Sequence, residues 1–287
     1  GVFTTDPRVV ENASKVDCVS FDEMLELASL GAGVMHSRSI EFAKKFGVDL
    51  CVRPSFMDGP GTRITSAPME PAPVVTGVAF VRDECRVSLV GVPDQPGVMS
   101  QVFAMLSDNR IPVDMVVQNL GAAGTANVSF TVAEDDLENA LTVANRAVDM
   151  LGGSVKHSDT LAKLSVVGHG MQTHTGVAGQ MFAVLAAHDV NISIVTTSEI
   201  KISVLIDRSR CDEAVRAVHA GFHLEQTACQ TPDVGVQSPA VQPSSAQRDT
   251  AKLEAAIVSR LSGMEDIVVS NVYSDATQAR VTIKSLE

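Results

Sequence analysis

The clearest hydrophobic pattern in the chain is an apolar strand that runs through a Pro/Gly turn directly into an amphipathic helix. Val87, Leu89 and Val92 alternate with smaller or polar residues, which is typical of a half-buried β-strand. After the turn at 93–97, apolar residues recur at helical spacing through Leu106. Such a junction directs free backbone N–H groups, at the positive end of a helix dipole, into one small space.

That space is suited to a carboxylate, and Asp94 in the same turn could meet an ammonium group. A carboxylate site beside an anionic side chain would suit a free amino acid. The alternative is that Asp94 only caps its own turn, as Asp often does.

The strand–turn–helix pattern occurs twice. Residues 164–168 repeat the strand at 87–91, and residues 176–185 repeat the helix at 97–106. We expect further strands at 113–119, 192–198 and 199–206, and further helices at 136–151 and 212–221. The order β-α-β-β-α-β predicts a four-stranded antiparallel sheet with both helices on one face. Small tandem units of this kind usually pair side by side, because each alone buries little apolar surface.

The N-terminal part has the pattern of the edge of an α/β domain. Ser20 and Glu23 have the spacing of a capping box and begin a helix that ends at Gly31. A second helix at 39–46 is followed by residues 48–52, which we interpret as a buried strand. Residues 57–73 are rich in Pro and Gly, which predicts a linker or a domain-edge loop.

The C-terminal part predicts a tether and a third, shorter repeat. Residues 227–249 are rich in Gln, Ser and Pro, which indicates a flexible linker. A helix is expected at 250–261, and residues 268–272 and 280–283 repeat the strands at 74–78 and 86–89. Because the chain opens at Gly1 without Met and the third repeat stops early, we expect both ends to be cut.

Composition excludes several classes of function. The chain has 287 residues, a net charge of −12, one Tyr and no Trp. With no basic stripe and few aromatic residues, it lacks the electrostatic and stacking contributions that nucleic-acid binding needs. It has no apolar run of membrane-spanning length and no export leader, which favours a cytoplasmic location. Its five dispersed Cys predict neither disulfides nor a metal site, and His169 and His174 lack nearby carboxylates or thiols for zinc.

Several ordered motifs resemble one family. Residues 1–8, 20–28 and 30–38 resemble the end of the aspartate kinase catalytic domain, and residues 76–79, 94–97, 114–119 and 197–203 resemble its regulatory ACT domains. The resemblance covers roughly residues 1–226. It implies the C-terminal edge of an α/β amino-acid-kinase domain followed by tandem βαββαβ, ferredoxin-like ACT domains.

The resemblance also implies a reaction and its regulation. Aspartate kinases are phosphotransferases with a carboxyl acceptor: with Mg²⁺, they transfer the γ-phosphoryl group of ATP to the side chain of L-aspartate. This is the first step toward lysine, threonine and methionine. L-Lysine, L-threonine or both are expected as feedback inhibitors bound between paired ACT domains, in a homo-oligomer. The alternative is a non-catalytic regulatory subunit or amino-acid sensor. Residues 1–56 argue against this alternative, because a sensor would have no use for the nucleotide residues Phe3 and Arg8.

On this basis the chain is divided into five parts. The expected parts are the end of the kinase domain at 1–66, a first ACT domain at 74–158, a second at 159–226, a linker at 227–249 and the start of a third ACT unit at 250–287. The strand near 74–82 would be shared with the second ACT domain.

Carried over residue by residue, the resemblance names two sites. The nucleotide residues are Phe3, Asp6, Arg8, Gly33 and Val34. The effector residues are Asp94, Gly97, Val98, Asp114, Gln118 and Asn119 in the first unit, completed by His174, Thr175, Val177, Asn191, Ile192 and Thr197 in the second.

Two features of the sequence qualify the nucleotide site. Phe3 stands where the family usually has Tyr, and Gly33 where it usually has Lys. A lost ammonium near the phosphates removes charge stabilisation, so either another group substitutes or nucleotide binding is weaker. The turn that holds Asp6 and Arg8 could also be merely solvated. The family's phosphate motif and aspartate-binding residues would lie upstream of Gly1, so we expect no catalytic residue in this chain and no activity from it alone.

Overall fold

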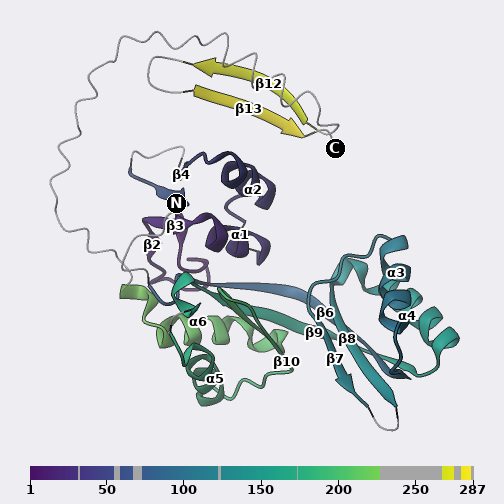
Figure 1. Ribbon diagram of the computed structural model, residues 1–287. Helices are drawn as coiled ribbons and strands as arrows, with labels where there is room; N and C mark the ends of the chain where they lie inside the picture. Colours follow the sequence, from purple (N-terminus) through teal and green to yellow (C-terminus); the bar gives the residue numbers. More distant parts are fainter. Residues whose placement is uncertain are drawn as a thin grey trace. The chain divides into compact units, whose positions relative to one another are not determined.

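The computed structural model (Figure 1) describes residues 1–31, 33–54, 59–66, 73–121, 124–172 and 174–226, and the backbone of two strands, 267–274 and 279–285. The chain forms two compact units, Gly1–Gln230 and Thr231–Glu287. In the second unit, β12 (Ile267–Ser274) and β13 (Ala279–Ser285) pair antiparallel. The expected tether at 227–249 and helix at 250–261 lie outside the described residues.

Residues 1–66, the N-terminal segment, contain two helices whose ends follow the sequence signals. Helix α1 (Phe21–Ser29) begins with the predicted capping box, in which Ser20 Oγ accepts from the Glu23 N–H at 3.2 Å and the Glu23 carboxylate accepts from the Ser20 N–H at 3.1 Å. Helix α2 (Ser37–Phe46) ends at Gly47, whose φ of 63° is left-handed. Short strands β1 (Val2–Phe3) and β2 (Lys15–Val16) pair antiparallel ahead of them.

Two predictions in this segment are wrong. Strand β5 (Thr62–Thr65) lies inside the expected loop at 57–73 and forms the middle of a sheet between β3 (Cys18–Ser20) and β4 (Leu50–Val52). Its alternation of buried Thr62 and Ile64 with exposed Arg63 was concealed by the flanking Pro and Gly. The expected buried strand at 48–52 is β4, an edge strand paired on one side only, and Cys51 in it is exposed.

The rest of the first unit is built around one six-stranded sheet of order β10-β11-β9-β6-β8-β7. Its two central strands, β6 (Gly77–Pro93) and β9 (Ser154–Val167), are 17 and 14 residues long and pair antiparallel along most of their length. The other elements are α3 (Val98–Asp108), β7 (Val116–Leu120), β8 (Thr125–Ala133), α4 (Leu137–Leu151), α5 (Val177–Ala187), β10 (Ile194–Thr197), β11 (Lys201–Asp207) and α6 (Cys211–Gly221), with 3-10 turns at Glu134–Asp136, His169–Gln172, Arg208–Arg210 and Leu224–Gln226.

The first half of this sheet has the predicted βαββαβ order, whereas the second half has the order βαββα and takes its fourth strand from the start of β6. The first repeat consists of the C-terminal half of β6, then α3, β7, β8, α4 and the N-terminal half of β9, with Leu89, Val102 and Phe130 in its core. The second repeat consists of the C-terminal half of β9, then α5, β10, β11 and α6, and it pairs with residues 77–81 of β6. Figure 1 shows α3 and α4 over one part of the sheet and α5 and α6 over the other. The predicted fold class is confirmed, and each long strand serves both repeats.

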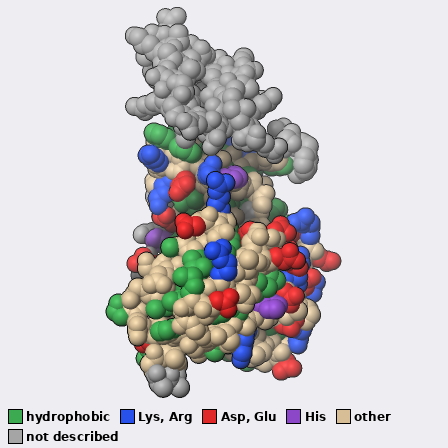
Figure 2. Space-filling view, turned by 90° about the vertical axis from the view of Figure 1, so that its right-hand side faces the viewer, with side chains coloured by type: hydrophobic (Ala, Val, Ile, Leu, Met, Phe, Trp, Pro, Cys, Tyr) green, Lys and Arg blue, Asp and Glu red, His purple; other side chains and the backbone are tan. Residues whose placement is uncertain are grey.

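No helix in the described ranges is both long and apolar enough to cross a bilayer. On the coloured part of the face shown in Figure 2, acidic and basic side chains are interspersed and no continuous basic surface forms.

Candidate functional site

A cleft of about 480 Å³ brings together all five residues expected to bind nucleotide. Phe3 lines it from the end of β1, and Asp6 and Arg8 line it from the loop that follows. Gly33 and Val34 line it from the loop between α1 and α2. Its apolar groups can contact a base, and its guanidinium groups can contact phosphate. The described residues therefore fit a nucleotide.

The opposite wall of the cleft is β6, from Val78 to Asp83. These residues belong to the large sheet, where Val78 pairs with Val166 and Val81 with Lys163. We did not include them in the site, because the run from Val78 to Val81 looks like any buried strand. Arg82 at the end of that run could have identified this wall of the cleft, because its cationic side chain is exposed beside a buried strand.

The loop of Asp6 and Arg8 is fixed by a fork of hydrogen bonds. Arg8 Nε donates to Asp6 Oδ1 at 3.0 Å and Arg8 Nη2 donates to Oδ2 at 2.7 Å, while the Arg8 N–H donates to Oδ1 at 2.9 Å. These donors lower the pKa of Asp6. The guanidinium is thereby oriented and partly neutralised, although its side chain remains 88% exposed.

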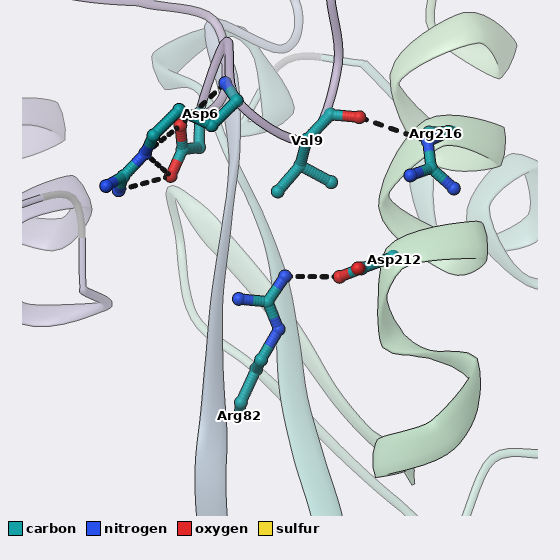
Figure 3. A network of polar contacts seen from close by, with 6 residues as sticks. Asp6, Val9, Arg82, Asp212 and Arg216 are labelled. Carbon is teal, nitrogen blue, oxygen red and sulfur yellow. Dashed lines mark hydrogen bonds and ion pairs between the residues drawn. The ribbon is translucent and has the colours of Figure 1, made fainter.

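The same loop is held on its other side by the second repeat. The Val78 N–H donates to Thr4 O at 2.7 Å, Thr4 Oγ1 lies 2.9 Å from His219 Nε2, and Arg216 Nε donates to Val9 O at 3.0 Å (Figure 3). His219 is buried, and burial lowers its pKa. The loop that holds Asp6 and Arg8 is therefore joined directly to helix α6.

Glu23 makes a second contact between the N-terminal segment and the large sheet, which the sequence motifs did not predict. Its carboxylate oxygen Oε1 accepts from Thr76 Oγ1 at 2.6 Å and from the His169 N–H at 2.9 Å. Glu23 thus caps α1 and also binds the two segments that enter and leave the sheet of the second repeat. The capping-box motif accounts for Glu23 by itself, so nothing in the sequence pointed to a second partner.

The two strand-to-helix corners have matching backbones. Gly97 precedes α3 with φ 95° and Gly176 precedes α5 with φ 100°, and a Cβ on either would contact nothing within 4 Å. These glycines are therefore needed for their left-handed conformation, not for space. Most of the expected effector side chains around them are exposed, namely Asp94, Asp114, Gln118, Asn119, His174, Thr175, Asn191 and Thr197, whereas Ile192 is half-buried and Val98 and Val177 are buried.

The two corners do not meet within one chain, so the expectation that they neighbour each other is wrong for a single copy. The antiparallel register pairs Val90 with Ser154 and Gly77 with Val167. The turn at 93–97 thus follows one end of the β6–β9 ladder and the turn at 168–176 follows the other end. At about 3.3 Å per residue, roughly 40 Å of strand separates them.

Asp114 already has a cationic partner. Lys163 Nζ pairs with the Asp114 carboxylate and lies 3.8 Å from Glu84 Oε2. Lys163 and Glu84 are buried, and burial raises the pKa of Glu84. An effector ammonium at Asp114 would therefore compete with Lys163.

A second cavity, of about 550 Å³, contains part of the expected second effector group. His174, Thr175 and Val177 line it together with Val74, Phe222 and other residues, whereas Asn191, Ile192 and Thr197 do not line it. Those three residues lie on or next to β10, an outer strand of the sheet. The expected second group is thus divided between two places in this chain.

Three comparisons with known proteins agree. A family model described as "Amino acid kinase family" matches residues 1–54, and one described as "ACT domain" matches residues 87–148 and 164–222. The solved regulatory subunit of aspartate kinase from Thermus thermophilus is 36% identical, with a TM-score of 0.50, over 52% of this chain and 99% of its own. The chain belongs to the aspartate kinase family.

Longer relatives agree with this assignment. The aspartate kinase of Stutzerimonas stutzeri is 45% identical over 234 residues, which are 80% of this chain and 57% of that protein. The solved aspartate kinase from Synechocystis is 36% identical, with a TM-score of 0.55, and the match covers 78% of this chain and 41% of that one. The chain therefore spans little more than half the length of the curated aspartate kinases it matches.

Proposed function

We propose that the protein containing this chain is a feedback-regulated aspartate kinase of the cytoplasm, which converts ATP and L-aspartate into ADP and 4-phospho-L-aspartate with Mg²⁺. One observation carries this proposal: the five residues matched to the family's nucleotide site converge on one cleft. Enzymatic phosphoryl transfer depends mainly on positioning and on stabilising charge. Asp6 and Arg8 would contribute by holding a cation at the cleft in a fixed orientation.

Mg²⁺ would enter with the nucleotide. Among the described residues, no group of three or more His, Cys, Asp or Glu side chains is placed to hold a metal ion. When bound with the nucleotide, the ion would supply positive charge that neutralises part of the charge of the phosphates.

The proposed effectors are L-lysine, L-threonine or both, bound where the corner of one chain meets that of a second copy. Gln118 and Asn119 lie on β7, and Thr197 lies on β10, and these are the two outer strands of the sheet. If β7 of one copy lies beside β10 of another, the two groups of effector residues come together. Ligand binding there would shift the population toward a less active arrangement.

A phosphorylation assay on the complete protein tests this function. We expect aspartate-dependent release of ADP from ATP, and inhibition by lysine, by threonine or by the two together. A protein that binds lysine or threonine but never phosphorylates aspartate would instead be a regulatory subunit, like the Thermus thermophilus relative that matches about half of this chain. Residues 1–54, which match the kinase model, favour the enzyme.

A further inference from the structure

Arg82 is the second cationic side chain that lines the nucleotide cleft. The cleft's charged lining consists of Asp6, Arg8, Arg82 and Asp83. Arg8 is already engaged by Asp6, and Gly33 on the facing loop carries no charge. A bound nucleoside triphosphate brings several negative charges, so it needs a cation that can turn toward it.

Arg82 is held by the second repeat instead of by the N-terminal segment. One of its terminal nitrogens donates to Asp212, in the first turn of α6, and its guanidinium lies 4.9 Å from the centre of the Phe80 ring. Figure 3 shows the Arg82 side chain extended from β6 toward Asp212. Both side chains of the pair are nearly half exposed, at 44% and 48%. A pair this exposed is weak enough to exchange partners.

Along one face, helix α6 contacts both Arg82 and the loop that follows β1. Asp212, Arg216 and His219 are spaced four and three residues apart, so they lie on the same side of the helix. They contact Arg82, Val9 and Thr4 respectively. A displacement of α6 would therefore change the position of Arg82 and of the loop that follows β1 together.

We infer that Arg82 binds the phosphates of the nucleotide, supplying the positive charge that Gly33 does not, and that Asp212 competes for its guanidinium. This inference rests on the proposed function and extends it. The position of α6 then sets how much of the time Arg82 is available to the nucleotide. Asp212 acts only through Arg82, as a positioning residue.

Nucleotide titration of the complete protein tests the inference independently of turnover. The dissociation constant for ATP, with Mg²⁺ in solution, should rise about 10- to 100-fold in Arg82→Gln, as expected for a lost charge-assisted hydrogen bond. Arg82→Lys, which keeps the charge, should retain most of the affinity. Asp212→Asn should lower the constant by up to about fivefold, the range of an exposed ion pair. When Asp212→Asn is added to the Arg82→Gln variant, the dissociation constant for ATP should not change further.

Gly33 provides a rescue experiment. A Cβ there would contact nothing within 4 Å, so a side chain can begin at this position without a clash. Gly33→Lys should restore ATP affinity to Arg82→Gln if charge at the cleft is what was lost. Arg210→Gln is the matched control, because Arg210 pairs with Glu213 on the same helix but does not line the cleft. This control should bind ATP like the wild type.

The outcomes separate the inference from the proposed function. An unchanged ATP constant in Arg82→Gln, or weaker binding in Asp212→Asn, would overturn the inference. If the wild type binds ATP but does not phosphorylate aspartate, the proposed function fails, while the ratio of the binding constants still decides the role of Arg82. A wild type that binds no ATP would overturn both.

Discussion

At the scale of single residues, the most demanding position is Lys163. Its ammonium is buried between Glu84 and Asp114, where the two repeats share β6 and β9. The register of β6 against β9 shifts on both sides of Glu84, and this carboxyl is buried. A buried carboxylate without a cation is costly, so the pair depends on both partners.

Replacement of Lys163 by Met should destabilise the fold by about 3–5 kcal/mol at neutral pH. The loss should shrink on acidification. Burial raises the pKa of Glu84 above its usual 4.5, so the folded state favours the protonated acid, which needs no counter-ion. Urea unfolding at several pH values measures this. The exposed Lys156 on the same strand is the control, and Lys156→Met should change stability by less than about 0.5 kcal/mol. A small, pH-independent loss in Lys163→Met would contradict the argument.

At the scale of elements, the helices and most strands lie where the sequence predicts, but one strand and the full length of another were missed. Capping-box, Gly and period-3.6 signals are local, so α1, α3, α4 and α6 were placed within a few residues. Strand β5 and the joining of two apolar runs into one β6 depend on partners distant in sequence, which no local pattern specifies. The cleft shows the same difference between local and distant signals. The family resemblance identified the residues of one wall, but it did not identify Arg82 on β6, which forms the other wall.

One corner glycine and one helix glycine give a matched pair of tests. Gly97→Ala should destabilise by about 1–2 kcal/mol, because alanine resists the left-handed conformation even where space is open. Gly179→Ala, inside α5 and equally open, should stabilise by about 0.5–1 kcal/mol, because its φ is not left-handed. Thermal unfolding of both variants measures the difference. Equal effects in the two variants would mean that the corner is not strained by a side chain.

At the scale of the whole molecule, the outer strands of the large sheet expose apolar side chains. Leu120 on β7 is 79% exposed, Val116 is 41% exposed, and Val195 on β10 is 40% exposed. Exposed apolar edge strands favour pairing with another chain. The separation of the two corners within one copy agrees with a need for a second copy.

Leu120→Asp should therefore weaken self-association by about tenfold or more and weaken effector binding with it. Sedimentation velocity measures the first effect and calorimetric titration with lysine or threonine the second. Met150 on α4, 70% exposed and away from the edge, provides the control Met150→Asp, which should change neither. Undiminished effector binding by a monomeric Leu120→Asp variant would show that one chain suffices.

The long strand β6 has a consequence for how the protein is made. Residues 77–81 leave the ribosome well before their sheet partners at 163–167, which belong to the end of β9. Until then the nascent chain carries an open strand edge that any neighbouring copy with a finished second repeat could cover. Exchange of β6 between two newly made chains is thus a built-in hazard of this architecture, and slow translation between α3 and β9 would increase it.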